Sequence, residues 1–149
     1  MQLTRVWEDQ EGQWDACQWC DVAMQHLPSD NVLACPAAPE LECGYAFNAA
    51  VDGLPRRALD RPSDLIIIFE SDAGWNAAGG PELLPDEPRH LGSDNYGFAD
   101  GHAQWIKRKQ NPDGTWSKEP DTDWVIWEPV LKESGAQEQG TSSGDRASG

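Results

Sequence analysis

The spacing of apolar residues near the start of the chain predicts one amphipathic helix over residues 14–27, with the sequence WDACQWCDVAMQHL. Its apolar stripe recurs at intervals of three and four and consists of Cys17, Cys20, Met24 and Leu27. Pro28 and the turn-forming residues that follow it indicate where the helix ends. A stripe of this kind is typical of a helix face that packs against a protein core.

Two apolar segments in the middle of the chain have the patterns of strands. Residues 45–51 alternate, which predicts a short strand. Residues 65–70, LIIIFE, form a continuous branched apolar run, which is typical of a strand that is covered on both faces. Residues 71–88 are irregular, and a loop of that length is often functional or wraps the domain.

The pair Asp100-Gly101 stands between two alternating segments, so we expect it to form the type I′ turn of a β-hairpin. Such a turn predicts three facing pairs: Ala99 with His102, Phe98 with Ala103, and Tyr96 with Trp105. Tyr96 and Trp105 then form a cross-strand aromatic pair, and His102 lies on the opposite, polar face.

The remainder of the chain predicts two more strands. The sequence NPDG at 111–114 is a second tight-turn signal, because proline favours its second position and glycine accepts the left-handed conformation. TWSKE follows it, and residues 124–130 form a further apolar segment. The expected fold is therefore α+β: one N-terminal helix packed on a mostly antiparallel sheet that ends in a C-terminal β-meander.

The chain of 149 residues suits one domain, with a short segment before it and a tail after it. We place the N-terminal segment at 1–13, the globular domain at 14–131 and the tail at 132–149. The tail is rich in Gly, Ser and Gln, so it buries too little apolar surface to offset its ordering entropy. We expect it to be flexible or to become ordered only against a neighbour.

The balance of charge excludes one class of partner. The net charge is −15, from 26 acidic and 11 basic residues, whereas nucleic-acid binding requires clustered Lys and Arg. The one basic cluster, residues 107–109, is expected to be the solvated end of a strand. No apolar run approaches the roughly 20 residues of a membrane span, and the first residues contain no signal-peptide hydrophobic region.

The four cysteines, Cys17, Cys20, Cys35 and Cys43, all lie in the first third of the chain. Their spacing favours a loop-closing Cys35–Cys43 disulfide, with Cys17 and Cys20 either paired together or each bridged to that loop. Disulfides imply an oxidising compartment. The competing interpretation is a zinc site with four thiolate ligands.

Several short motifs, each weak by itself, follow one another in a particular order. His90 is followed by nine residues, LGSDNYGFA, and then by Asp100-Gly101. Before and around this spacing lie LACPAAPE, GYAFNAAVDGL, RPSDLIIIFESD and NYGFADGHAQWI. In these motifs the chain resembles, from Trp14 to Trp127, the bacterial H-x9-DG pseudopilin-like proteins, which are processed like type IV prepilins.

The resemblance implies a globular head that is extracellular, at the cell surface or in the periplasm. Heads of this type are normally carried on a long hydrophobic N-terminal helix, which packs into a filament core or anchors in the inner membrane. No prepilin-like cleavage site or apolar helix precedes Trp14. We therefore expect either a soluble part of a longer protein or a variant that assembles with like neighbours through its sheet, loops and tail.

Several polar side chains are candidates for chemistry: Glu70, Asp72, His90, Asp94, Asp100 and His102. Glu70 and His90 are suited to acid–base work, to metal binding, or to a hydrogen bond that fixes the long loop. We expect structural roles for Glu70, His90 and Gly101. No catalytic triad, phosphate loop or nucleotide motif is present, so we expect an assembly subunit and not an enzyme. The rival is a Cys/His zinc module or a metal-dependent enzyme.

Calcium is the cofactor that the acidic loops favour, because it binds carboxylate and carbonyl oxygens. Some pseudopilins that this chain resembles hold calcium in their C-terminal loops. One candidate site consists of Asp72, Asp94, Asn95 and Asp100. The second consists of Asp113, Asp121 and Asp123.

Overall fold

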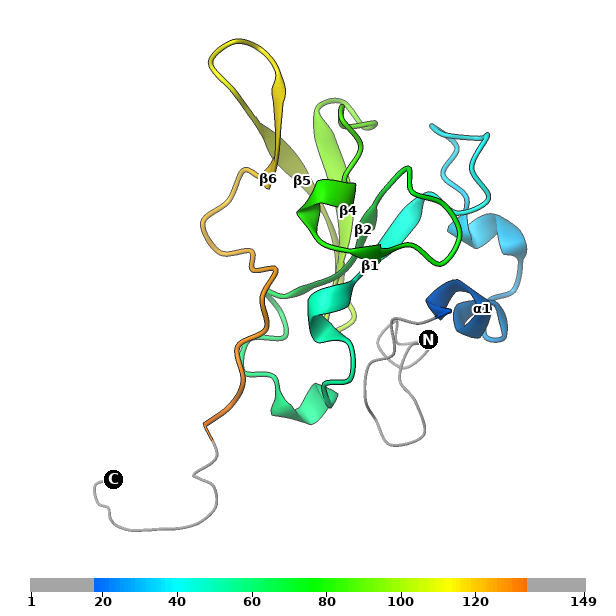
Figure 1. Ribbon diagram of the computed structural model, residues 1–149, viewed down its shortest axis with the longest axis vertical. Coiled ribbons are helices and arrows are strands. Elements are labelled where there is room, and N and C mark those ends of the chain that lie inside the picture. The colour runs from blue at the N-terminus through cyan, green and yellow to red at the C-terminus, as the bar shows by residue number, and fades with distance from the viewer. Residues whose placement is uncertain (1–17, 134–149) are drawn as a thin grey trace.

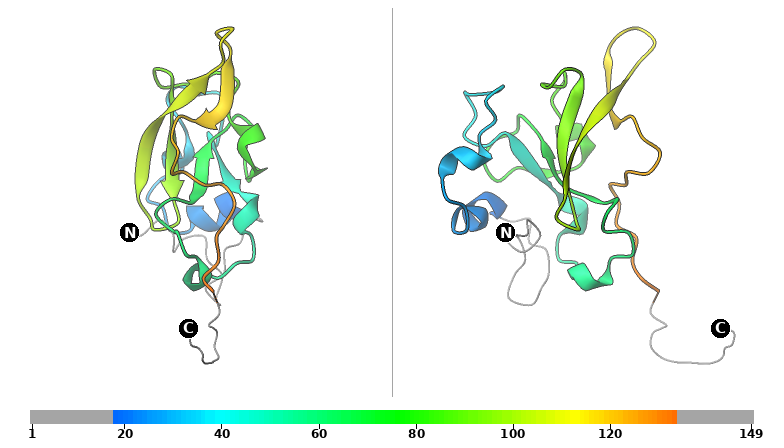
Figure 2. Two further views of the ribbon diagram at one scale, coloured as in Figure 1. Left: turned by 90° about the vertical axis from the view of Figure 1, so that its left-hand side faces the viewer. Right: turned by 180° about the vertical axis from the view of Figure 1, so that it is seen from behind.

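The computed structural model describes residues 18–133, of which residues 30 and 31 are described as backbone only. This part of the chain has an α+β fold, with one short α-helix and a six-stranded sheet (Figure 1). In sheet order the strands are β3 (Ala78–Gly79), β1 (Tyr45–Asn48), β2 (Ile66–Glu70), β4 (Ser93–Phe98), β5 (Ala103–Gln110) and β6 (Trp116–Pro120). Only the β1–β3 pair is parallel among these neighbours. Figure 2 shows that the sheet is curled and that the outer end of the β5–β6 hairpin extends beyond the other strands.

Short 3-10 helices connect the strands: η2 (Asp30–Leu33), η3 (Ala49–Val51), η4 (Arg56–Ala58) and η5 (Pro81–Leu83). Among residues 18–133 there is no helix with the length and apolar character that crossing a bilayer requires.

Both faces of the sheet carry a hydrophobic core, as the continuous apolar run of β2 predicts. One core joins the α-helix to the sheet through Trp19, Cys20, Ala23, Phe47 and Ile67. The other core joins the sheet to the C-terminal segment through Ile66, Phe69, Tyr96, Phe98, Trp124 and Trp127. Full burial of a side chain such as Phe69 stabilises the fold by about 2 kcal/mol.

The helix α1 spans Trp19–Met24, which is shorter than the predicted 14–27. Residues 14–17 of that prediction, including Cys17, lie outside the described residues. The 71–80 loop holds the start of the helix. Asn76 accepts a hydrogen bond from the Cys20 backbone N–H at 2.8 Å, and the Trp19 indole donates to the Ala77 carbonyl at 2.8 Å. Tertiary contacts, more than helix propensity, therefore define this short element.

Strand β1 ends three residues earlier than predicted, because the side chain of Asn48 redirects the chain. Its Oδ1 accepts from the Ala50 N–H at 3.1 Å and so caps the 3-10 helix that follows. Its Nδ2 donates to the carbonyls of Ile66 and Trp127, both at 2.8 Å. One buried amide thus joins β1, β2 and the C-terminal segment.

The Asp100-Gly101 turn is at the predicted place, but the predicted register is wrong by one residue. Tyr96 faces Gln104, and Trp105 faces Asn95. The turn is a three-residue loop in which Gly101 N–H bonds to the Phe98 carbonyl and only Gly101 has positive φ. The extra residue is Ala99, whose N–H bonds to the carbonyl of Leu65, the residue before β2.

The register shift changes which aromatic side chains meet. Trp105 is 53% exposed, and the aromatic partner of Tyr96 is Trp127, with ring centroids 6.2 Å apart. His102, expected on the polar face, stacks on Phe98 with centroids 4.4 Å apart. The predicted Tyr96–Trp105 pair is therefore absent. Tyr96 instead contacts Trp127, and His102 contacts Phe98, on the side of the second core.

The second predicted turn is confirmed, and the last predicted strand is wrong. Gly114 N–H bonds to the Asn111 carbonyl and has a φ of 90°. Residues 124–130 make one isolated bridge, Ile126 with Leu65, and Leu131, just after them, makes another with Leu59. Their tryptophans instead cover the second core, with Trp127 edge-on to Phe69 at 4.9 Å. The apolar pattern of residues 124–130 therefore arises because this coil segment packs on the second core, and not because it belongs to the sheet.

Candidate functional site

The carboxylate of Glu70 is the centre of a buried polar cluster at the end of β2. Its side chain has no exposed surface. Oε1 is 2.8 Å from His90 Nε2 and 3.4 Å from Arg89 Nη1. Oε2 accepts a 2.6 Å hydrogen bond from the Asn95 backbone N–H. The Glu70–His90 contact that the sequence raised as one possibility is present, and it joins the 89–92 turn to β2.

His90 is presented by a tight turn that leads into β4. The backbones of His90 and Ser93 exchange hydrogen bonds of 3.3 and 3.2 Å, and both central residues, Leu91 and Gly92, have positive φ. This left-handed conformation is costly for Leu91, which is 93% exposed. The Trp105 indole donates to the His90 carbonyl at 3.2 Å. The turn therefore fixes the imidazole against Glu70 at some conformational cost.

Cys35 completes the cluster from the loop that follows η2. Its Sγ lies 3.6 Å from His90 Nε2 and 3.9 Å from Glu70 Oε1. Gly44 packs so closely that a Cβ there would be 2.9 Å from the Cys35 Cβ. Only glycine allows this approach between the Cys35 loop and the start of β1.

Arg89 supplies the nearest positive charge. Its Nη2 donates to Asp72 at 2.5 Å. The side chains of Arg89 and Glu70 are both buried. Its other acceptors are the carbonyl oxygens of Gly44 and Ser71. Burial opposes the charge, but the hydrogen bonds to Asp72 and Cys35 and the charges of Asp72 and Glu70 outweigh it and raise the pKa of Arg89. The guanidinium therefore remains charged.

The geometry favours metal binding over a nucleophilic relay. In a Cys–His–carboxylate relay the two imidazole nitrogens face different partners. Here Nε2 of His90 faces both Cys35 and Glu70. Within the described part of the chain, these are the residues of the one group of three or more His, Cys, Asp or Glu whose donor atoms converge, all within 4.8 Å of one another.

The structure does not bring together the first set of predicted calcium ligands. Asp94 is buried against Arg108, and Asp72 pairs with Arg89. Asp100 bonds to His102 Nδ1 at 2.5 Å on the surface. Asn95 contributes its backbone N–H to Glu70. Each carboxylate has a separate protein partner.

The second predicted set is also spread out. Asp113 precedes β6, whereas Asp121 and Asp123 follow it. Asp113 accepts from the hydroxyl and backbone N–H of Thr115, and these hydrogen bonds lower its pKa. Calcium binding at either set stays a prediction without geometric support.

The described cysteines differ from the favoured pairing. Cys20, Cys35 and Cys43 are free thiols, and the Cys35–Cys43 disulfide is not formed. Cys43 instead lies against Cys20, with the sulfur atoms 3.5 Å apart. The Cys20 thiol donates to Cys43, which raises the pKa of Cys20 and lowers the pKa of Cys43. The described thiols therefore do not form a single zinc cluster.

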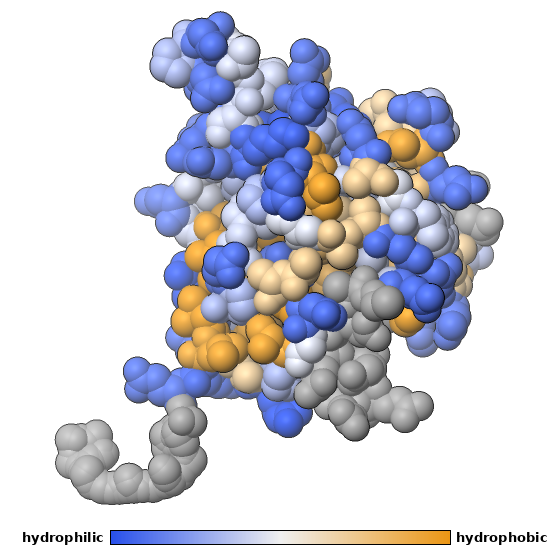
Figure 3. Space-filling model, in the orientation of Figure 1, coloured by the Kyte–Doolittle hydropathy of each residue, from blue (hydrophilic) through white to orange (hydrophobic). Residues whose placement is uncertain are grey.

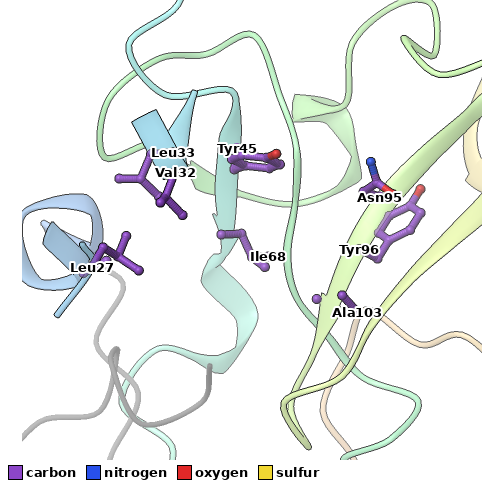
Figure 4. Close-up of a pocket in the computed structure, with 10 residues that line it drawn as sticks. Leu27, Val32, Leu33, Tyr45, Ile68, Asn95, Tyr96 and Ala103 are labelled. Carbon is purple, nitrogen blue, oxygen red and sulfur yellow. The ribbon is translucent and has the colours of Figure 1, made fainter. Parts of the chain in front are cut away.

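An apolar groove of about 260 Å³ lies beside the cluster, on the sheet face next to α1 (Figure 4). Leu27, Val32 and Leu33 form one wall, and Ile68 and Ala103 line the sheet side. Asn95, whose backbone holds Glu70, also lines it. The groove is thus a neighbour of the polar cluster.

The sequence indicated Glu70 and His90 as candidate site residues, but it did not indicate that Cys35 and Arg89 contact them. The closeness of Cys35 and Cys43 in sequence favours pairing them with each other. The sequence did offer a signal for Arg89. It directly precedes His90, and residues 71–88 before it contain no basic side chain. Nothing local linked Cys35 to residues 70 and 90.

Comparisons with known proteins do not identify the chain. No protein-family model, curated protein or solved structure matches it.

Proposed function

We propose that this chain is a structural assembly domain of the pseudopilin-like type, working in the bacterial periplasm or at the cell surface. The observation that carries this proposal is that residues of the H-x9-DG motif make contacts that hold the fold together. His90 bonds to Glu70, and Glu70 accepts a hydrogen bond from the Asn95 backbone N–H within β4. Contacts of this kind hold the turn before β4 against β2.

The Asp-Gly end of the motif supports the same proposal. Asp100 N–H bonds to the Pro62 carbonyl, and Ala99 N–H bonds to Leu65, so the turn is docked on the loop before β2. The Asp100 carboxylate accepts from the His102 N–H at 3.1 Å. Gly101 supplies the left-handed residue that the turn requires. The motif therefore pins both ends of the β2–β4 pair.

The surface offers places where copies of a subunit could meet. Strand β6 ends the sheet, and an edge strand can pair with another chain. Exposed apolar side chains include Val130 and Leu131, near the end of the described C-terminal segment. Figure 3 shows that hydrophobic atoms are exposed on the same side of the molecule as that end. The net charge of −15 opposes contact between copies, so we expect assembly to depend on screening.

Sedimentation velocity and electron microscopy of the purified chain test the assembly. From about 0.01 M to about 1 M salt, the Debye length falls from about 30 Å to about 3 Å. We expect larger species with a regular subunit repeat as the salt concentration rises. Monomers at every salt and protein concentration would contradict the proposal.

A pair of histidine variants tests the structural use of the motif. His90→Asn is expected to lower the free energy of unfolding by about 1–3 kcal/mol, because the buried Glu70 loses a partner. His26→Asn, the matched control at an exposed position outside the motif, is expected to change it by less than about 0.5 kcal/mol. Turnover of a compound that is lost in a normally folded His90→Asn variant would contradict a structural role.

A further inference from the structure

We propose that Cys35, Glu70 and His90 form a zinc-binding site, in which Sγ, Oε1 and Nε2 coordinate the ion. This site is different from the four-thiolate cluster that the sequence alone suggested, and it goes beyond the assembly function. Two of its ligands are fully buried, and His90 is 29% exposed, so the ion reaches the site from the His90 side.

The spacing of the three donor atoms fits a tetrahedral ion. With bonds of about 2.3 Å to sulfur and about 2.0 Å to nitrogen and oxygen, tetrahedral angles require about 3.5 Å between sulfur and each other donor, and about 3.3 Å between nitrogen and oxygen. The observed distances are 3.6 and 3.9 Å from sulfur and 2.8 Å between Nε2 and Oε1. Binding thus requires shifts of about half an ångström.

The chemistry of the donors selects zinc over calcium and magnesium. A thiolate and an imidazole are poor ligands for those hard cations, which prefer oxygen. Zinc accepts sulfur, nitrogen and carboxylate oxygen together. Three protein ligands leave one coordination position for water, as in zinc sites that are open to solvent.

The charges around the site balance when the ion is bound. Zn²⁺ is neutralised by the Cys35 thiolate and the Glu70 carboxylate, while His90 is neutral. Arg89 keeps a separate partner in Asp72, at 2.5 Å. Its contact with Glu70, at 3.4 Å, is the longer of the two and is the one that the ion replaces.

Binding releases protons and keeps the outer contacts. The Cys35 thiol loses its proton to solvent, so the affinity must fall as the pH falls. The Asn95 N–H continues to hold Glu70 through Oε2, which leaves Oε1 directed at the ion. A ligand oriented in this way by an outer partner is typical of metal sites.

Isothermal titration of the metal-free full chain with zinc alone tests the site. We expect one ion per chain, with an affinity that decreases from neutral to mildly acidic pH. Cys35→Ser is expected to weaken binding more than about 100-fold, beyond the usual effect of losing an outer-shell partner. Cys43→Ser, the matched control, removes another buried thiol and should leave the affinity unchanged.

A measurement on the unaltered chain keeps the test independent of how the variants fold. Zinc is expected to slow alkylation of Cys35 more than alkylation of Cys43, as mapped by peptide mass spectrometry. Three outcomes would each overturn the site: no zinc binding, equal affinity in Cys35→Ser, or protection of Cys43 alone. None of them would affect the assembly proposal, which sedimentation tests separately.

Discussion

Arg108 and Asp94 form a bidentate ion pair in which neither side chain has exposed surface. Nε and Nη2 of Arg108 donate to the two carboxylate oxygens at 2.9 and 2.7 Å. Nη1 donates to the Pro85 carbonyl at 2.6 Å and so connects β5 to the loop before β4. The expectation that residues 107–109 form a solvated strand end is therefore wrong for Arg108, which points into the second core.

Removing one partner of this pair is expected to be far more costly than removing both. Asp94→Leu leaves a buried, unpaired guanidinium, so we expect a loss of about 3–5 kcal/mol in the free energy of unfolding, measured with urea. Combining it with Arg108→Met replaces both charges by apolar groups and is expected to recover most of that loss.

The exposed pair Lys109–Glu119 serves as the control, because its side chains are 47% and 63% exposed. Glu119→Gln is expected to cost less than about 1 kcal/mol. A double variant at 94 and 108 that is as unstable as Asp94→Leu would show that the pair itself, and not the burial of an unpaired charge, stabilises the fold.

Replacing Leu91 by asparagine is expected to stabilise the protein. Leu91 has a φ of 58° and is 93% exposed, so it loses no packing and adopts a conformation that asparagine tolerates better. The gain should be about 1 kcal/mol, read as an increase in melting temperature. Leu91→Val, which is β-branched, should lower the melting temperature. An asparagine variant less stable than the parent would contradict the prediction.

Asp21 is expected to couple the helix to the 71–80 loop in a pH-dependent way. Hydrogen bonds from Asn76 at 2.7 Å and from Trp75 at 3.0 Å lower the pKa of this carboxyl. A lowered pKa in the folded state means that the stabilisation is present above the ordinary pKa and is lost as the pH falls through the folded-state value.

The indole N–H resonance of Trp75 reports this titration. We expect its chemical shift to change below pH 3.8, the ordinary pKa of the group. The Asp21→Asn variant should show no such change. A transition at or above the ordinary pKa would mean that the hydrogen bonds to Asp21 are not formed in solution.

Cys20 and Cys43 are expected to form a disulfide when the protein is treated with oxidised glutathione, which takes up the electrons. Their sulfur atoms are 3.5 Å apart, and Cys43, with its lowered pKa, is the thiol that attacks first. Closing the loop between residues 20 and 43 should stabilise the fold by about 3 kcal/mol.

The test uses a Cys17→Ser/Cys35→Ser background, in which Cys20 and Cys43 are the only cysteines. Thiol counting by mass spectrometry should show both thiols lost, and the melting temperature should increase. Persistent free thiols, or intermolecular dimers only, would show that the geometry does not permit the bond.

Local signals predicted the elements well where the physics is local. The continuous run at 65–70 predicted a strand covered on both faces, and β2 is buried on both faces. The Asp-Gly and Asn-Pro-Asp-Gly sequences placed both reversals correctly, because positive φ at Gly101 and Gly114 depends on the residue itself. These features depend on backbone preference and side-chain pattern within a few residues.

The misses share one cause. The hairpin register depends on Ala99, whose N–H bonds to Leu65 more than thirty residues away in sequence. Residues 124–130 look like a strand because tryptophans cover a core, not because they pair in the sheet. In both cases a distant partner decided which hydrogen bonds the segment makes.

By itself the sequence determined the acidic charge, the two reversals and the buried strand, and it raised a contact between Glu70 and His90 as one possibility. Only the tertiary structure decided that Cys35 and Arg89 join them and that Arg108 is buried. Residue type and spacing set backbone conformation and burial over a few positions. The partners of a buried polar group, however, are whichever distant side chains the fold places within a few ångströms, and no local pattern records that choice.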